Sequence, residues 1–548
     1  MHKLKTILSV LLVAVIAVTL VACGGNNAAT GTSQSSAGAA ASSSTDAQSS
    51  APAQKDYSEH MKISIALNTT NIDVNSDPFA QTWDKKFNME WEIVAMTEDK
   101  AAEMTRVWIN SGDMPDVVNW QYLHSEAMSY VKQGLIHKLP DDWKTRWPNI
   151  AKTYKDSGVG DKFDEMFGGT YVLPKPIYSS NKPVDTLINH WGIWYRADWF
   201  KAVGAEAKDR YTTRELMDIA KKIKEQDPGK VGGSLVPIDV PTSLLPYIFV
   251  EPNSTYTQDI SQFYADKDGV FHWGPADPET LEGLKLWREA YDAGILHHEF
   301  YTLPTGRENE ADLNTAGKAA VNVAAGMATV GSRQATFMRA NLNVDPNEAL
   351  NFAFILDKSS TYRANEIVNF YGTVLLSPKL NDAKLGRILD ILDYSATDEA
   401  QYLIRMGFEN EDWKKDANGQ IVSLLPPDQQ VTQKYISVQP LYTGMLVLPD
   451  NFQLVNPVLP QIWRDKARNQ YVEKTKIADP TSSHLDLDVY FYTSPVMSRA
   501  ILNLPEEYAS IVLKGKDVEA NWKSWVNEKM SLVQPALDEL TKMKKEKK

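Results

Sequence analysis

Hydrophobic and polar residues alternate from Met61 to Asn68, which is the pattern of a strand with one buried face. Apolar residues then recur at helical spacing near Phe79–Phe87, and a second strand-like run occupies 89–96. The stretch 98–112 gathers its apolar residues on one helical face and ends in glycine, and 115–120 is typical of a short buried strand. This succession of strands and helices predicts a parallel α/β layer.

The same mixture of patterns continues along the chain. Helical spacing covers 213–226 and 278–294, whereas strand-like runs lie at 318–326, 351–357 and 372–378. Helical patterns dominate after the last of these runs, and no repeat of short period is present in the sequence. We therefore expect an α/β fold with more than one lobe.

The N-terminal residues follow a different pattern. A basic start precedes an apolar run over 7–22, which is shorter than the ~20 residues that a membrane-spanning helix needs. The run ends in Leu-Val-Ala-Cys and resembles the bacterial lipobox, which implies that 1–22 is a lipoprotein signal peptide. The thiol of Cys23 would then carry the palmitate-type acyl chains of a membrane anchor. The alternative is a buried free cysteine at the end of an uncleaved anchor helix.

The segment that follows, 24–54, consists almost entirely of Ser, Ala, Gly, Thr, Asn and Gln. Such a composition buries too little apolar area to offset the entropy of ordering, so 23–55 is predicted to be a lipidated, disordered tether. A flexible chain of this length has a reach of about 30 Å. The remaining residues are numerous enough for a folded body of two or three lobes.

Charge and cysteine content limit the possible partners. The net charge is −13 for the whole chain, and an acidic body argues against nucleic acid or an anionic membrane surface as a partner. Membrane attachment is therefore expected through the lipid anchor alone. Cys23 is the only cysteine, so no disulfide is expected.

The sequence lacks the common catalytic and cofactor motifs. It contains no G-x-x-x-x-G-K-[ST], H-E-x-x-H, C-x-x-C or G-x-S-x-G pattern. The adjacent residues of His297–Glu299 point apart and are a poor metal site, and the D-K-D-G and D-A-N-G stretches at 266–269 and 416–419 are typical of hairpin turns rather than calcium loops. We therefore expect no enzymatic activity, no cofactor and no metal.

Aromatic residues beside amides and carboxylates are abundant. The chain has 15 Trp and 23 Tyr, many in stretches such as VNWQYLH, INHWGIWYR, GVFHWGP and NFYGT. A flat ring covers the apolar face of a pyranose while planar polar groups bind its hydroxyls, so these stretches favour sugar recognition. Any single aromatic residue taken alone more often belongs to the core. That interpretation weakens where the residue follows a buried strand, because α/β proteins bind ligands at the carboxyl ends of strands.

Three blocks resemble a known family. They are SGDMPDVVNW (111–120), GIWYRADWFKAVG (192–204) and LDYSATDEAQYLIRMGFENEDWKKDANGQ (392–420). In this order, behind a lipobox and tether, they are similar to family 1 extracellular solute-binding proteins, in particular the long lipoproteins of oligosaccharide importers in Gram-positive bacteria. The resemblance implies a two-lobed, periplasmic-binding-protein-like α/β fold with interlobe crossing strands and a helical C-terminal region. It also implies a monomer that closes on an oligosaccharide and delivers it to the permease subunits of an ABC transporter.

The resemblance suggests how the lobes divide and where the ligand lies. Lobe 1 would comprise 56–188 with about 352–398, and lobe 2 would comprise 189–351 with about 399–548. The strand at 115–120 would present Asn119, Trp120 and Gln121 to the cleft, with Trp120 as the main stacking residue.

Other candidates follow from the same resemblance. The first crossing would place His190 and Trp191 near the hinge, and the strand in LVPIDVPT would present Asp239 and Thr242. The return strand in VNFYGTVLLSP would add Asn369 and Tyr371 as ligand-binding residues, and the stretch GVFHWGP would add Trp273.

The sequence departs from the family at one place. Many long members carry a calcium loop after the helix that begins near Tyr211, but here the loop reads DPGKVGGSLVP and retains only Asp227 of the expected carboxylates. A calcium ion takes six to eight oxygen ligands, several of them anionic. We therefore predict that this loop binds no structural calcium.

Two other functional classes stay open at the level of sequence. A surface glycoside hydrolase or lyase would need a close pair of carboxylates in the cleft, which spacing alone does not reveal. A peptide receptor would share the same architecture. Sequence also leaves the identity, linkage and length of the ligand undetermined.

Overall fold

The structure is a computed structural model that describes residues 57–546, apart from several short segments. The segments outside the description are 69–72, 98–99, 121–123, 179–190, 255–261, 304–316, 327, 364–365, 420, 427–428, 430, 439–440, 442–444, 447–458 and 479–485. The chain divides into Met1–Lys55 and a compact unit, Asp56–Lys548, to which all the described elements belong. Within these described ranges, no helix is both long and apolar enough to cross a membrane.

A first five-stranded sheet has the order β2-β1-β3-β12-β4. Its strands are β1 (Met61–Asn68), β2 (Met89–Met96), β3 (Val117–Trp120), β4 (Leu173–Pro176) and β12 (Phe370–Leu376). Strand β1 is parallel to β2 and β3, and β12 runs antiparallel between β3 and β4. The strand that arrives last in the sequence therefore occupies an interior position of this sheet.

A second five-stranded sheet has the order β6-β11-β5-β10-β7. Its strands are β5 (Trp191–Arg196), β6 (Arg210–Thr212), β7 (Val236–Ile238), β10 (Ala319–Ala325) and β11 (Leu350–Leu356). Strand β5 is central and antiparallel to both β10 and β11, while β7 and β6 pair in parallel with these two. The carboxyl ends of β7, β10, β11 and β6 thus share the edge at which β5 begins.

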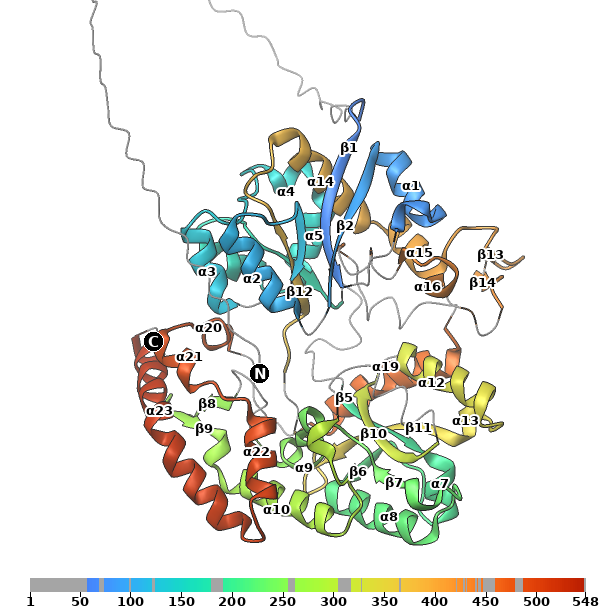
Figure 1. Ribbon diagram of the computed structural model, residues 1–548, viewed down its shortest axis with the longest axis vertical. Coiled ribbons are helices and arrows are strands. Elements are labelled where there is room, and N and C mark those ends of the chain that lie inside the picture. The colour runs from blue at the N-terminus through green and yellow to red at the C-terminus, as the bar shows by residue number, and fades with distance from the viewer. Residues whose placement is uncertain are drawn as a thin grey trace, which may run out of the picture. The chain divides into compact units, whose positions relative to one another are not determined.

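Helices cover both faces of each sheet (Figure 1). The helices around the first sheet are α1 (Pro78–Phe87), α2 (Ala101–Ser111), α3 (His124–Lys132), α4 (Trp143–Arg146), α5 (Pro148–Asp156), α6 (Gly160–Phe167), α14 (Asp382–Ser395), α15 (Asp398–Met406) and α16 (Val431–Lys434). Those around the second sheet are α7 (Ala197–Ala202), α8 (Thr213–Gln226), α9 (Pro246–Phe249), α10 (Pro278–Asp292), α12 (Ala328–Asn341), α13 (Pro346–Ala349) and α19 (Gln461–Lys476). The C-terminal region adds α20 (Leu487–Tyr490), α21 (Pro495–Ala500), α22 (Leu504–Leu513) and α23 (Val518–Glu546).

The alternation of side chains along each strand divides the core into layers. In the first sheet, Ile63 and Ile65 of β1 face one buried cluster, whereas Ala66 faces another. In the second sheet, Ile193 and Trp194 of β5 separate in the same way. Each sheet is thus buried on both faces, as expected for α/β proteins.

Two short hairpins complete the strands: β8 (Phe263–Ala265) pairs with β9 (Phe271–Trp273), and β13 (Trp413–Lys415) pairs with β14 (Ile421–Ser423). The D-K-D-G stretch lies between β8 and β9 and the D-A-N-G stretch between β13 and β14, and Gly269 and Gly419 have positive φ angles of +77° and +76°. Both stretches are therefore hairpin turns, as the sequence predicts.

The α/β fold with two sheet-centred lobes confirms the fold class that the sequence predicts, but two segments lie differently from the expected division. Strand β11 pairs with β5 over 350–353, so the return to the first sheet begins after Leu356 rather than near 352. Buried residues of α15 and α16, such as Ile404 and Val431, pack into the core of the first sheet rather than the second. Continuous ladder pairing and shared burial, which sequence periodicity does not report, determine these assignments.

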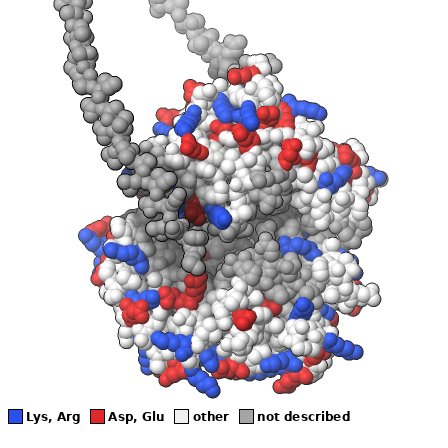
Figure 2. All heavy atoms as spheres, viewed as in Figure 1, with Lys and Arg blue, Asp and Glu red and all other residues white. Residues whose placement is uncertain are grey.

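Acidic and basic side chains are interspersed over the face shown in Figure 2. Many form ion pairs at the surface, among them Lys285–Glu519 and Lys144–Asp164. The negative net charge is therefore spread across this face rather than gathered in one patch.

Candidate functional site

In the first sheet, three side chains meet where β3 ends. The β12 ladder pairs Val374 with Asn119 on one side and Gly372 with Lys175 on the other, which brings β3 and β4 residues together. The Nζ atom of Lys175 lies 3.4 Å from Oδ1 of Asn119 and 4.9 Å from the ring centre of Tyr371. Tyr371 is 42% exposed, so its ring covers the buried ammonium group and leaves an aromatic surface toward solvent.

Lys175 is a functional candidate that the sequence does not reveal. Its side chain is fully buried, and burial lowers the pKa of its ammonium group to about 7, with a further contribution from the charge of Arg405. It lies within the short segment LPKP, in which no periodicity marks a binding residue. Only the pairing of β4 with β12 brings it beside Asn119 and Tyr371, both of which the sequence predicts.

In the second sheet, an aromatic pair marks the start of β5. The ring of the half-buried Trp191 stacks on Tyr247 of α9, with the centroids 5.5 Å apart and the planes at 21°. The two rings line a small cavity of about 30 Å³ together with Glu251 and Arg363. Stacked rings beside a carboxylate and a guanidinium group suit a ligand with both apolar and polar faces.

The buried Lys474 of α19 fixes the backbone beside this pair. Its Nζ donates a hydrogen bond of 2.8 Å to the carbonyl oxygen of Trp191, and it lies 5.2 Å from the ring centre of Tyr362. Burial lowers the pKa of the ammonium group to about 7. Lys474 thus connects α19 to the first residue of the strand that carries the aromatic pair.

Asp239 and Thr242 follow β7 at the same edge of the second sheet. Asp239 is 2% exposed, and burial raises the pKa of its carboxyl group to about 6, while the charge of His297 opposes the shift. A parallel bridge between Ile238 and Leu296 places the two residues that follow, Asp239 and His297, side by side. Thr242 donates a hydrogen bond of 3.2 Å from Oγ1 to the carbonyl oxygen of Phe300.

Two of the predicted ligand-binding residues serve the packing of the fold. Trp273 is 2% exposed, donates from Nε1 to Gln262 Oε1 at 3.0 Å and packs against Trp525 with centroids 5.1 Å apart. The amide of Asn369 donates to the carbonyl oxygens of Asp156 and Tyr178 at 2.6 and 2.8 Å and accepts from the amide N–H of Tyr178 at 2.9 Å. These contacts already satisfy both side chains, so neither is available to a ligand in this conformation.

The remaining predicted residues lie partly or wholly outside the described residues. Trp120 belongs to β3, where its backbone pairs with Thr373, but its side chain is not among those described. Gln121, His190 and Cys23 lie outside the described residues altogether.

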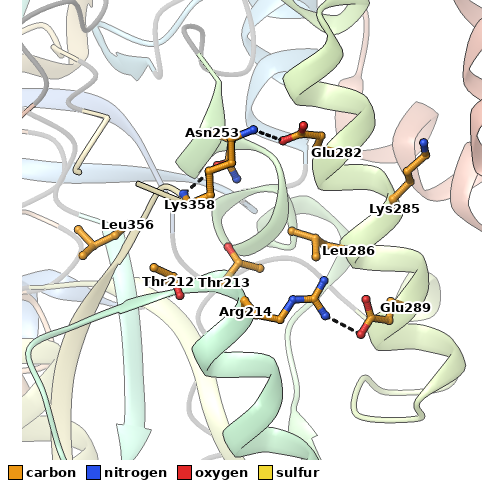
Figure 3. A pocket seen from close by; sticks show the side chains of 10 residues that line it. All are labelled: Thr212, Thr213, Arg214, Asn253, Glu282, Lys285, Leu286, Glu289, Leu356 and Lys358. Carbon is orange, nitrogen blue, oxygen red and sulfur yellow. Dashed lines mark hydrogen bonds and ion pairs between the residues drawn. The ribbon is translucent and has the colours of Figure 1, made fainter. Parts of the chain in front are cut away.

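A cavity of about 420 Å³ lies between the N-terminal end of α8, helix α10 and the end of β11 (Figure 3). Its charged side chains are already paired: Lys358 with Glu282 at 2.8 Å and Arg214 with Glu289 at 2.6 Å. Lys285 pairs with Glu519 beyond the rim. The sequence gives no indication of this cavity, because its walls come from four separate segments.

The loop that follows α8 is held by Asp227 itself. Oδ1 accepts a hydrogen bond from the amide of Val231 at 2.8 Å, and Oδ2 accepts one from the amide of Gly232 at 2.7 Å. Among the residues that the structure describes, no group of three or more His, Cys, Asp or Glu side chains is placed to hold a metal ion.

Two sheets that each present aromatic and polar side chains beside strand ends define a two-lobed α/β binding protein. Residues 77–401 match the family described as bacterial extracellular solute-binding protein. The match spans more than half of the chain, and the chain belongs to this family.

Solved structures agree with this assignment at the level of the fold. The alginate-binding protein AlgQ2, crystallised without calcium ion, is 15% identical, with 90% of this chain and 99% of that chain covered and a TM-score of 0.66. The substrate-binding protein FusA of a Streptococcus pneumoniae ABC transporter, in complex with kestose, is 14% identical with coverages of 89% and 99% and a TM-score of 0.65. The N-glycan transport solute-binding protein NgtS of Streptococcus pneumoniae, in complex with Man5GlcNAc, is 14% identical with coverages of 89% and 98% and a TM-score of 0.55. The matched family and these structures are binding proteins rather than enzymes. A search of the curated proteins found no match.

Proposed function

We propose that this chain captures an oligosaccharide outside the cell and delivers it to the permease subunits of an ABC importer. The observation that carries the proposal is the family match over 77–401. Support for a sugar comes from the proteins of similar fold, which include a kestose complex and a Man5GlcNAc complex. Ligand capture would then shift the population from an open to a closed arrangement of the lobes.

The proposed site combines residues from both sheets. The first sheet contributes Asn119, Trp120, Gln121 and Tyr371, with Lys175 supporting the ring of Tyr371. The second contributes Trp191, with Tyr247 stacked against it, together with Asp239 and Thr242. Rings would cover the apolar faces of sugar units, and the amides, carboxylate and hydroxyl would bind their hydroxyl groups. Trp273 and Asn369 are omitted because their contacts serve packing.

A titration of the purified chain against a panel of plant, host and microbial oligosaccharides tests this function. We expect saturable heat release with one class of oligosaccharide and no change in the sugar after incubation. Release of shortened sugars would instead favour a glycoside hydrolase or lyase, and binding of peptides alone would favour a peptide receptor.

We further propose that Cys23 anchors a monomeric protein to the outer face of the cell membrane of a Gram-positive bacterium. The lipobox resemblance and the apolar run at 7–22 support this. Cys23→Ser removes the thiol that would be acylated, so we expect uncleaved precursor or protein released into the medium. Fractionation with mass spectrometry measures this. Normal processing and membrane retention of the variant would contradict the anchor.

A further inference from the structure

The carboxyl group of Asp239 has no hydrogen-bond partner for Oδ1 among the described residues, although only 2% of the residue is exposed. The backbone holds it firmly, because its amide donates to the carbonyl oxygen of Val321 on β10 at 3.1 Å. Buried polar atoms are nearly always paired, and exceptions concentrate at functional sites. The position of Asp239 directly after β7, at the carboxyl edge of the sheet, is where α/β proteins bind ligands.

Few charges surround this carboxyl group. The elements next to it in the chain and in the ladder, β7, β10 and the 3-10 turn Thr242–Leu244, carry no titratable side chain. The neighbouring loop carries His297, His298 and Glu299, of which the half-buried His297 acts on Asp239. Apart from the imidazole of His297, Asp239 is therefore an acceptor without a cationic partner in the described structure.

We infer that Asp239 selects a neutral sugar unit, because its carboxylate accepts hydrogen bonds from ligand hydroxyl groups and repels a unit that carries a carboxylate of its own. This inference rests on the proposed function and adds the substrate class. A hydroxyl group supplies the donor that Oδ1 lacks, whereas a uronate would bring a second negative charge into a buried site. Ligands rich in free hydroxyl groups and free of carboxylates fit this edge of the sheet.

A proton should move with the ligand. Burial favours the neutral acid and raises the pKa of Asp239 to about 6. Hydroxyl donors from a bound sugar favour the ionised form and so lower that pKa, which means that binding near pH 6 releases a proton. The affinity for a neutral sugar therefore falls as the pH drops below about 6.

The test is calorimetry on the full-length chain with matched probes: manno-, gluco- and galacto-trisaccharides and the corresponding uronate trisaccharides, at pH 7.5 and 5.0. In the wild type we expect a neutral probe to bind at least about tenfold more tightly than its uronate and to weaken about tenfold at pH 5.0. Asp239→Asn should lower the affinity for the neutral probe about tenfold at pH 7.5. The affinity of this variant should no longer depend on pH, and the ratio of its affinities for the neutral probe and the uronate should be smaller than in the wild type. Asp268→Asn, at an exposed position in the β8–β9 turn, is the matched control.

A measurement on the wild type alone covers the possibility that Asp239→Asn does not fold. Titration at pH 6.0 in two buffers of different ionisation enthalpy should show proton release on binding. Three outcomes would each overturn the inference while leaving sugar capture intact. The uronate could bind more tightly than the neutral probe, or binding could release no proton. A folded Asp239→Asn protein could also bind both probes as the wild type does. If no saccharide of either charge binds in the probe set or the wider panel, the proposed function fails and the inference fails with it.

Discussion

Tyr371 and Trp273 are two aromatic candidates that the structure separates by exposure. Tyr371→Ala should weaken oligosaccharide binding by about tenfold, because stacking contributes ~0.5–1.5 kcal/mol beyond buried area, and should barely change stability. Trp273→Ala should instead lower the free energy of unfolding by ~3–5 kcal/mol, because it empties a site in the core. Calorimetry and denaturant unfolding on both variants measure this. Lost stability in Tyr371→Ala would contradict its assignment to the binding site, and lost affinity with unchanged stability in Trp273→Ala would contradict its assignment to the core.

Lys474 makes stability depend on pH. Its pKa is about 7 in the folded protein and 10.5 as the reference value, so the folded state binds fewer protons between these values. The free energy of unfolding should therefore rise with pH from about 7 toward 10. The cost of burying the charged ammonium group is present in full below about pH 7 and disappears as the pH rises toward 10. In Lys474→Met the free energy of unfolding should depend less steeply on pH. Part of the dependence should persist, because burial also lowers the pKa of Lys175.

Chemical denaturation at pH 7, 8 and 9 measures the effect, with the exposed Lys267→Met as control. An unchanged slope in Lys474→Met would show that Lys474 titrates normally in the folded protein.

Sequence predicts individual site residues only where a pattern marks a strand end. Asn119 follows two buried valines and Tyr371 precedes an apolar run, and both lie beside Lys175 in the structure. Lys175 and Tyr247 could not be predicted, because their place depends on partners that are distant in sequence. The error with Trp273 has a related cause, since an aromatic residue at a strand end can face either the ligand or the core.

At the scale of elements, α8 and its following loop show what local chemistry determines. The helix spans Thr213–Gln226 as the spacing predicts, and a capping box between Thr212 and Glu215 fixes its start. Its end depends on Asp227, whose two carboxylate oxygens accept hydrogen bonds from the backbone amides of Val231 and Gly232. Strand order, by contrast, could not be read from periodicity, because β12 pairs across nearly two hundred residues with β4.

Asp227→Ala should lower the free energy of unfolding by about 1–2 kcal/mol, because two amides lose charged acceptors. A chelator such as EDTA should leave the melting temperature of the wild type unchanged. The matched control is the exposed Glu225→Ala on the last turn of α8. A fall in melting temperature with EDTA that added calcium restores would contradict the prediction that this loop binds no calcium.

At the scale of the whole molecule, the C-terminal region contacts the hydrophobic cores of both sheets. Phe491, just after α20, packs against Phe163 with centroids 5.2 Å apart and belongs to the core of the first sheet. Its neighbour Tyr492 donates to Glu539 of α23 at 2.9 Å, and α23 packs in the core of the second sheet. The sequence predicts a helical C-terminal region but not this double attachment, because helical periodicity does not report which core a helix contacts.

The interior position of β12 also bears on the order in which the molecule folds. All five strands of the second sheet lie between Trp191 and Leu356, so its ladders can form before the first sheet has all its strands. The first sheet must wait for Phe370–Leu376 to enter between β3 and β4, which costs loop-closure entropy. Pulsed hydrogen exchange during refolding should therefore find the amides of β5, β10 and β11 protected before those of β3 and β4. A chain threaded through a membrane from its N-terminus would keep one edge of β3 open, and β4 without a partner strand, until β12 emerged, so these backbone groups would need protection by a chaperone during such a passage.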